Sequence, residues 1–294
     1  MHLGYVAAAM PDDFADTPIS KVRYSMRQRW IVTPYFFDEH DAALMNAVPD
    51  DMPFDLNNVG PLADRSPGTL QRTHRPIAGF VKEAVLSGDL PVSIAGDCGA
   101  SLPVMSGLQQ AGLNPVLVWL DAHPDFNTEE NSPTGFLGGM PLAKMVGRGN
   151  LSLPKTTGHV PLAESDCWLV GARDYDPPER EGLDASDVHE ISVTELKNLF
   201  FDRPVHLHID NDVVDALDVP ANNYPVPNGL PLEEVIEHCS EFATNNRICA
   251  LSLSGWNGDL DDSGKTAKAC RKLMSAVAIA AGRVSGRGGC SHQA

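Results

Sequence analysis

Short runs of aliphatic and β-branched residues alternate with amphipathic segments along most of this chain. An apolar run bounded by turn residues is typical of a buried strand, and a 3.6-residue period is typical of a surface helix. Because strands that alternate with helices form parallel sheets covered on both faces, the pattern predicts an α/β fold. The predicted strands are residues 92–95, 116–120, 168–171, 188–191, 205–209 and 248–253.

Two segments in the C-terminal part show the helical period most clearly. One carries an apolar stripe, and the other extends from residue 267 to residue 281. Residues 33–74 are rich in Pro, Asp and Asn, and their pattern indicates no particular element. The stripe of the first helix consists of Leu232, Val235, Ile236, Cys239 and Phe242, and one side of the second carries Leu273, Val277 and Ala280.

Length and composition limit the class of protein. No linker divides the 294 residues, so we expect a single domain over 1–294 with a flexible glycine-rich tail at 282–294. No apolar run approaches the roughly 20 residues that a membrane span needs. The first ten residues lack a basic signal-peptide region, and six scattered cysteines favour reduced thiols, so we expect a cytoplasmic protein. A formal charge of −17 argues against a nucleic-acid partner.

Two acidic runs follow predicted strands. In an extended segment alternate side chains share a face, so we expect Asp121, His123 and Asp125 to converge, and likewise Asp210 and Asp212. The four carboxylates, clustered around one imidazole, would repel one another unless divalent cations neutralised their charge. Mixed oxygen and nitrogen ligands suit Mn(II), with Zn or Fe less favoured. The two runs together therefore predict a two-metal site.

Each acidic run taken alone has a simpler interpretation. An isolated D-x-D or D-x-H-x-D segment is often a turn cap or a solvated loop. The combination is stronger, because the preceding residues 115–120 and 204–209 both have the composition of buried parallel strands. In open α/β sheets, ligand sites form where such strands end.

Three motifs in order resemble those of the ureohydrolases, the arginase and agmatinase family: GDCGASL at 96–102, DAHPDFN at 121–127 and HIDND at 208–212. The resemblance covers roughly residues 75–282. It implies a three-layer α/β/α domain around a mainly parallel eight-stranded sheet. It also implies two Mn(II) ions bridged by a hydroxide, which attacks a guanidino carbon and expels an amine, leaving urea or hydroxyurea and ornithine.

The same resemblance assigns roles to individual residues. Asp121 and Asp210 would bridge both metals, His123 and Asp212 would complete one, and Asp125 would bind the other and hydrogen-bond the hydroxide. The catalytic part would thus fall to Asp125, His123 and Asp210. Family members commonly form trimers or hexamers, so we expect a homo-oligomer, although nothing in the sequence identifies an interface.

Three further positions match the part of the arginase site that holds the substrate's head group. Asn127 and Thr134 fall where an α-carboxylate is bound, and Asp176 falls where an α-ammonium is bound. They imply a guanidino L-amino acid as the small-molecule partner. Taken singly, Asn127 and Thr134 could equally cap loops, and Asp176 could lie in a surface turn.

Three departures from the family pattern affect the expected chemistry. Cys98 replaces the first histidine ligand, Gly138 replaces a proton-shuttling histidine, and Gly255 replaces the glutamate that pairs with the guanidinium. A guanidinium is permanently charged and would lack its partner here. A less basic N-hydroxyguanidine avoids that difficulty, and Cys98 resembles the branch that hydrolyses Nω-hydroxy-L-arginine.

The sequence leaves alternatives open for the roles of Cys98 and His208 and for the function. Cys98 could be a metal ligand that weakens one site, a small buried residue, or a nucleophile. His208, on the same face as Asp210, could support a metal-binding carboxylate or be a satisfied core residue. Activity on agmatine or a formimino substrate, and a non-catalytic protein that binds a metal or a guanidino ligand, are the other functions to consider.

Overall fold

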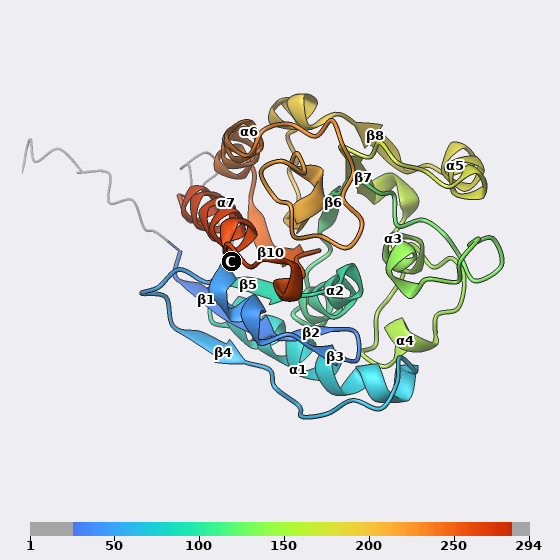
Figure 1. Ribbon diagram of the computed structural model, residues 1–294, viewed down its shortest axis with the longest axis horizontal. Coiled ribbons are helices and arrows are strands. Elements are labelled where there is room, and N and C mark those ends of the chain that lie inside the picture. Colours follow the sequence, from blue (N-terminus) through green and yellow to red (C-terminus); the bar gives the residue numbers. More distant parts are fainter. Residues whose placement is uncertain (1–25, 284–294) are drawn as a thin grey trace, which may run out of the picture.

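The computed structural model describes residues 26–283, and its centre is a twisted sheet with helices on both faces (Figure 1). All neighbouring strands in this eight-stranded sheet are parallel. In spatial order the strands are β4 (Phe54–Leu56), β1 (Gln28–Thr33), β5 (Leu90–Ala95), β10 (Ile248–Ser254), β9 (Val205–Asp210), β6 (Val116–Leu120), β7 (Cys167–Val170) and β8 (His189–Ile191). The predicted eight-stranded α/β/α architecture is confirmed.

Helices cover the two faces of the sheet in separate pairs. α1 (Pro67–Leu86) packs against α2 (Ser101–Gln110) on one face, and α6 (Leu232–Asn245) packs against α7 (Lys265–Ala281) on the other. Shorter helices complete the first face and its periphery: α3 (Pro141–Met145), α4 (Ser152–Lys155) and α5 (Pro177–Asp184). None of the described helices is both long and apolar enough to cross a membrane.

Alternate residues of each strand point to opposite faces of the sheet, so one strand contributes to both hydrophobic cores. In β6, Val116, Val118 and Leu120 face the core beneath α6 and α7, whereas Leu117 and Trp119 face the core beneath α1 and α2. The neighbouring strands β9 and β10 differ from β6 on the face beneath α1 and α2, because there they carry buried polar residues. These are His206, His208, Ser252 and Ser254, and they form a polar column that leads toward the strand ends.

All six predicted strands are present, and both predicted helices are confirmed. The second begins at Lys265, where the Asp261 carboxylate accepts hydrogen bonds from the backbone nitrogens of Thr266 and Ala267. Gly282 follows this helix as its cap, and residues 284–294 of the predicted tail lie outside the described residues.

The prediction missed β1, β4, α1 and α2. α2 is almost wholly buried, so its sequence has no polar face to reveal a helix. β4 is an exposed edge strand without an apolar run. The unassigned residues 33–74 contain β4, the start of α1 and a small antiparallel hairpin of β2 (Tyr35–Phe36) and β3 (Glu39–His40). The hairpin bends over the carboxyl ends of the central strands, where Gly96 N donates to Tyr35 O.

Candidate active site

A pocket of about 290 Å³ opens where β5, β6, β9 and β10 end. Strand order makes this convergence possible, because β10 and β9 lie between β5 and β6, which are consecutive in the chain apart from the α2 crossover. Such switches in strand order create crevices at the carboxyl edge of a sheet. The pocket is lined by all the predicted metal-site residues: Cys98, Asp121, His123, Asp125, Asp210 and Asp212.

The segment after β6 is a turning loop, and this corrects the expectation that residues 121–125 form an extended segment. β6 ends at Leu120, and Asp125 has a left-handed backbone with φ of 52°. Asp121 and His123 are joined locally, since Asp121 Oδ1 accepts from His123 N at 2.8 Å. The side chains therefore converge through a turn and not through strand alternation.

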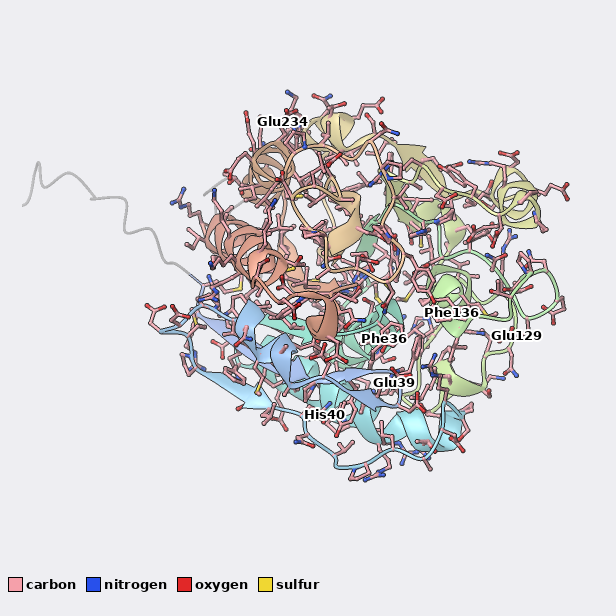
Figure 2. The ribbon with its side chains drawn as sticks, viewed as in Figure 1. Phe36, Glu39, His40, Glu129, Phe136 and Glu234 are labelled. Atoms are coloured by element: carbon pink, nitrogen blue, oxygen red, sulfur yellow. The ribbon has the colours of Figure 1, made fainter. Side chains whose placement is uncertain are left out.

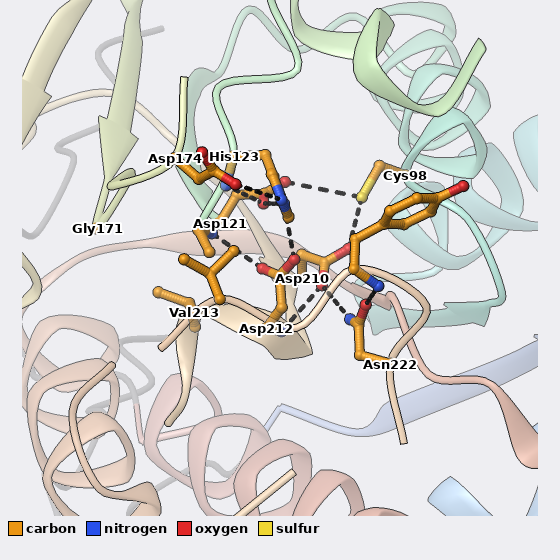
Figure 3. Close-up of polar contacts among 12 residues, drawn as sticks. Cys98, Asp121, His123, Gly171, Asp174, Asp210, Asp212, Val213 and Asn222 are labelled. Carbon is orange, nitrogen blue, oxygen red and sulfur yellow. Dashed lines mark hydrogen bonds and ion pairs between the residues drawn. The ribbon is translucent and has the colours of Figure 1, made fainter. Parts of the chain in front are cut away.

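The segment after β9 turns in a similar way. Asp210 ends the strand, and its Oδ1 accepts from Asp212 N at 2.9 Å, which opens a short 3₁₀ turn (Asn211–Val213). Asp212 Oδ1 then accepts from Ala122 N at 2.9 Å, tying the two acidic loops together. Figure 3 shows the carboxylates of both loops directed into the same space.

Two groups of potential ligand atoms share Asp121. Cys98, Asp121 and Asp125 form one group, and Asp121, His123 and Asp212 form the other, each with its atoms within 4.8 Å of one another. Asp210 belongs to neither group by this measure, but its Oδ2 lies 2.9 Å from Cys98 Sγ. Two clusters joined through one carboxylate can hold two neighbouring cations.

Burial makes this cluster electrostatically costly without a metal. Desolvation, then the neighbouring charges, raise the pKa of Asp210 to about 7 and that of Asp212 to about 6, and raise the pKa of Asp125 well above its usual value. Desolvation would lower the pKa of His123, but hydrogen bonds to Asp121 and Asp212 raise it to about 12. His123 Nδ1 lies 2.9 Å from Asp212 Oδ2, so a charged imidazole offsets part of the negative charge.

The donor set fits divalent cations. Asp125 Oδ2 is buried and has no hydrogen-bond partner among the described residues, which is unusual for a carboxylate oxygen. Carboxylates, an imidazole and a thiol are ligands for Mn(II), Fe(II) or Zn(II). Asp121, shared by both groups, would be the natural bridge between two such ions.

Cys98 lies at the inner end of the pocket, in a short 3₁₀ turn (Cys98–Ala100) after β5. Its Sγ contacts Asp210 Oδ2 at 2.9 Å and Asp121 Oδ2 at 3.9 Å (Figure 3). It also lies 2.9 Å from Ser254 Oγ. Desolvation, then the nearby carboxylates, raise the pKa of this thiol well above its usual value. A neutral thiol is a poor nucleophile, so these surroundings favour metal binding over covalent catalysis.

His208 supports the site only indirectly. The ring lies against Trp119, with centroids 3.9 Å apart, and Nδ1 contacts Ser101 Oγ at 2.6 Å. Within residues 26–283 it contacts no carboxylate directly. Its connection to Asp210 passes through Ser254, whose Oγ is 3.4 Å from both His208 Nε2 and Asp210 Oδ2. Trp119 is the closer support, since its Nε1 donates to Asp121 Oδ2 at 3.0 Å.

The three predicted head-group residues lie on one side of the pocket. Asn127 Nδ2 donates to Asp176 Oδ2 at 3.0 Å, and Asn127 Oδ1 is buried without a partner among the described residues. Thr134 lines the same wall from an exposed loop. Asp176 also begins α5 as its N-cap. Asn127, Thr134 and Asp176 thus add a polar wall to the pocket that holds the acidic cluster.

Sequence reasoning missed Glu179, which is buried beside this wall. Its Oε1 accepts from Phe126 N at 2.7 Å and its Oε2 from Asp176 N at 3.3 Å. Desolvation raises the pKa of Glu179 to about 7. The signal was present, because a Glu three residues after Asp176 is the spacing of a helix capping box.

An aromatic wall was also missed. Phe36, Phe136 and Tyr224 line the pocket, and the Phe136 ring lies 6.4 Å from that of Phe36 and 5.1 Å from that of Tyr224. Figure 2 shows Phe36 and Phe136 near each other at the centre of the molecule. The two rings come from segments a hundred residues apart with no shared motif, so only the fold brings them together. A Cβ atom at Gly138 would lie 2.5 Å from Phe136 Cζ, which means that Phe136 occupies the space of a side chain at 138.

Known proteins resemble this chain in both sequence and structure. A sequence profile of the Arginase family matches residues 24–280. An arginase from Brevibacillus brevis is 30% identical over 216 residues, covering 68% of this chain and 72% of that protein. An N(omega)-hydroxy-L-arginine amidinohydrolase from Streptomyces lavendulae is 30% identical over 204 residues, covering 67% of this chain and 71% of that protein. The solved arginase of Bacillus caldovelox has a TM-score of 0.75 at 22% identity, covering 86% of this chain and 98% of its own.

The family match begins well before residue 75, where the predicted resemblance began, because it includes β1, β4 and the start of α1. It covers most of the sheet and both acidic loops. The chain therefore belongs to the Arginase family and is a hydrolase of linear amidine C–N bonds.

Proposed function

We propose that this protein hydrolyses the guanidino or N-hydroxyguanidino C–N bond of an L-amino acid at a pair of Mn(II) ions. The observation that carries the proposal is the pair of ligand groups sharing Asp121. Asp121, Asp125, Asp210 and Asp212 would hold the cations with His123 and Cys98. When bound, two divalent cations lower the pKa of water toward neutrality and stabilise negative charge on the reacting group.

The protein's own residues would orient and desolvate the reacting carbon. Asp125 has a free oxygen, Oδ2, directed into the buried cluster, so it can accept a proton from the attacking water. His123 is held by Asp212 at 2.9 Å, which fixes the orientation of the ring. Phe36, Phe136 and Tyr224 add apolar surface to the pocket lining, which would limit water around a bound substrate.

The polar wall supports an amino-acid substrate. Asn127 with Thr134 offers hydrogen bonds to an α-carboxylate, and Asp176 offers a charge to an α-ammonium. Asp176 already accepts from Asn127, so both groups are held in one orientation before a ligand arrives. Agmatine, which lacks the carboxylate, would forfeit the first of these contacts.

An N-hydroxyguanidine suits the reacting end better than a guanidinium does. The backbone at Gly138 and Gly255 supplies neither a proton-shuttling imidazole nor a carboxylate to pair with a cation. A neutral N-hydroxyguanidine needs no such partner. The similarity to a protein named as an N(omega)-hydroxy-L-arginine amidinohydrolase supports this choice, with hydroxyurea and ornithine as products.

A Mn-loaded assay against arginine, Nω-hydroxyarginine, agmatine, guanidinobutyrate and formiminoglutamate tests the proposal. We expect turnover of Nω-hydroxyarginine to exceed that of arginine, and both to exceed that of agmatine. Asn127→Ala should raise KM for the amino acids roughly tenfold or more, as the loss of one hydrogen bond to a charged group implies. Asn131→Ala, which alters a capping residue of the same loop, is the matched control.

Two other functions make different predictions in this assay. Preference for agmatine or formiminoglutamate would contradict the amino-acid assignment, and binding without turnover would indicate a non-catalytic family member. We also propose a homo-oligomer, a trimer or hexamer as in the family, and light scattering that finds a stable monomer would contradict it.

A further inference from the structure

Ser254 ends β10 directly beneath Cys98. Its Oγ lies 2.9 Å from Cys98 Sγ and 3.4 Å from Asp210 Oδ2. The side chain is buried, so no bulk water competes for these contacts. Cys98 therefore has two close polar neighbours, one a carboxylate that can only accept when ionised, and the other a hydroxyl that can donate.

The polar column determines where the Ser254 hydroxyl hydrogen points. His208 Nδ1 is contacted by two hydroxyls, Ser101 Oγ at 2.6 Å and Ser252 Oγ at 2.9 Å. In the neutral tautomer that carries its hydrogen on Nε2, both hydroxyls can donate to Nδ1. In that tautomer Nε2 donates toward Ser254 Oγ, which lies 3.4 Å away. The Ser254 hydrogen then has two possible acceptors, Cys98 Sγ at 2.9 Å and Asp210 Oδ2 at 3.4 Å, and the sulfur is the closer.

We propose that Ser254 is a positioning residue for Cys98, donating a hydrogen bond that holds the sulfur toward the Asp121 and Asp125 carboxylates and stabilises it as a metal ligand. The inference rests on the proposed metal-binding role of Cys98. A cysteine side chain is shorter than the histidine it replaces in the family pattern, so its sulfur must be held in one rotamer to reach a shared ion. Asp210 Oδ2 lies on one side of the sulfur and Ser254 Oγ on the other, and of these two only the hydroxyl can donate to a thiolate.

Ser252 is the matched control. It lies two residues before Ser254 on the same strand and the same face, is buried, and contacts His206 and His208, but no contact links it to Cys98. Both hydroxyls contact His208, so removing either one disturbs the polar column. Removal of the Ser254 hydroxyl alone changes the surroundings of the sulfur.

The experiment titrates metal-free full-length protein with Cd(II) and records the ultraviolet thiolate-to-metal charge-transfer band. We expect Ser254→Ala to weaken Cd(II) binding at the sulfur site roughly tenfold, the effect of one lost hydrogen bond to a charged group. Ser252→Ala should stay within about twofold of wild type. In a Cys98→Ala background the band should vanish, and Ser254→Ala should then leave the affinity for Mn(II), measured by calorimetry, unchanged.

The results separate this inference from the proposed function. A wild-type band with equal Cd(II) affinity in Ser254→Ala would overturn the positioning role and leave the proposed function intact. Absence of the band in wild type would remove Cys98 from the ligand set and overturn the inference too. In that case Mn-dependent turnover, assayed in parallel, decides whether the proposed function survives.

Discussion

The main chain at Gly255 passes so close to Asp210 that a Cβ atom at residue 255 would lie 2.6 Å from the carboxylate carbon. Gly255 also has φ of +87°, a conformation that other residues adopt at a cost. The glutamate expected at this position by family resemblance is therefore not simply missing. The local backbone and the Asp210 carboxylate occupy the space that a side chain would need.

Gly255→Ala should disturb the metal centre through Asp210. We expect affinity for Mn(II) to fall roughly ten- to hundredfold, as for other residues that support a metal ligand. Gly264→Ala is the control, since Gly264 has φ of +63° with nothing within 4 Å of its would-be Cβ. The Gly264 variant has the same kind of backbone strain, but its new Cβ does not collide with a metal ligand. Isothermal titration of both variants checks the prediction, and equal affinities would show that Asp210 moves aside freely.

Gly138→Ala should be poorly tolerated because of the Phe136 ring. The new Cβ would lie 2.5 Å from Phe136 Cζ, so the ring must leave the aromatic wall. Gly139→Ala is the neighbouring control, because its Cβ would meet its nearest atom, Asn127 Nδ2, at an ordinary 3.7 Å. We expect Gly138→Ala to lower kcat/KM roughly tenfold, as misplacement of a pocket residue can. Steady-state kinetics of the pair would contradict this if both variants lost activity equally.

Asp210→Asn should have opposite effects on metal binding and on metal-free stability. Removing a buried carboxylate relieves repulsion in the empty cluster, so the Tm of the metal-free protein should rise by roughly 2–4 °C, the shift for about 1 kcal/mol in a chain of this size. Mn(II) binding and turnover should be lost. Asp174→Asn changes a carboxylate at the same pocket whose side chain is 65% exposed, and should do neither. Calorimetric scans with and without Mn(II) test both claims.

The stabilisation provided by Mn(II) should increase from pH 6 to pH 8. The pKa of Asp210 is raised to about 7 and that of Asp212 to about 6, so protons occupy these ligands at low pH and compete with the cation. In the metal-free protein, the raised pKa of each carboxyl group adds folding stability at low pH, and this stability is lost as the pH rises through that pKa. His123, with its pKa raised to about 12, carries a proton in the metal-free protein across this range, and the ring must release that proton to bind a cation, which adds to the same rise.

The measurement is the difference in Tm between Mn-loaded and metal-free protein at each pH. Buried histidines far from the cluster, such as His74 with its pKa lowered to about 4 by desolvation, titrate alike in both forms and cancel in the difference. A difference in Tm that is flat or falls with pH would contradict the raised ligand pKa values.

Local sequence determined most of the central sheet and the composition of the site. Apolar runs predicted strands such as 116–120 and 205–209, and the acidic residues that follow them predicted a metal site. Both signals lie within a few consecutive residues, so they can be recognised without the fold. α2 and β4 gave no such signal, since a helix buried on all sides and an exposed edge strand both lack a periodic contrast.

Tertiary structure alone decided which side chains share the pocket. The contact of Ser254 with Cys98 joins residues 156 positions apart, and the packing of Phe136 beside Phe36 joins two distant segments. Local periodicity carries no information about such distances, because they depend on strand order and on the packing of loops over the sheet's edge. The amino-acid sequence specifies which chemical groups are present, whereas strand order and loop packing set which of them meet.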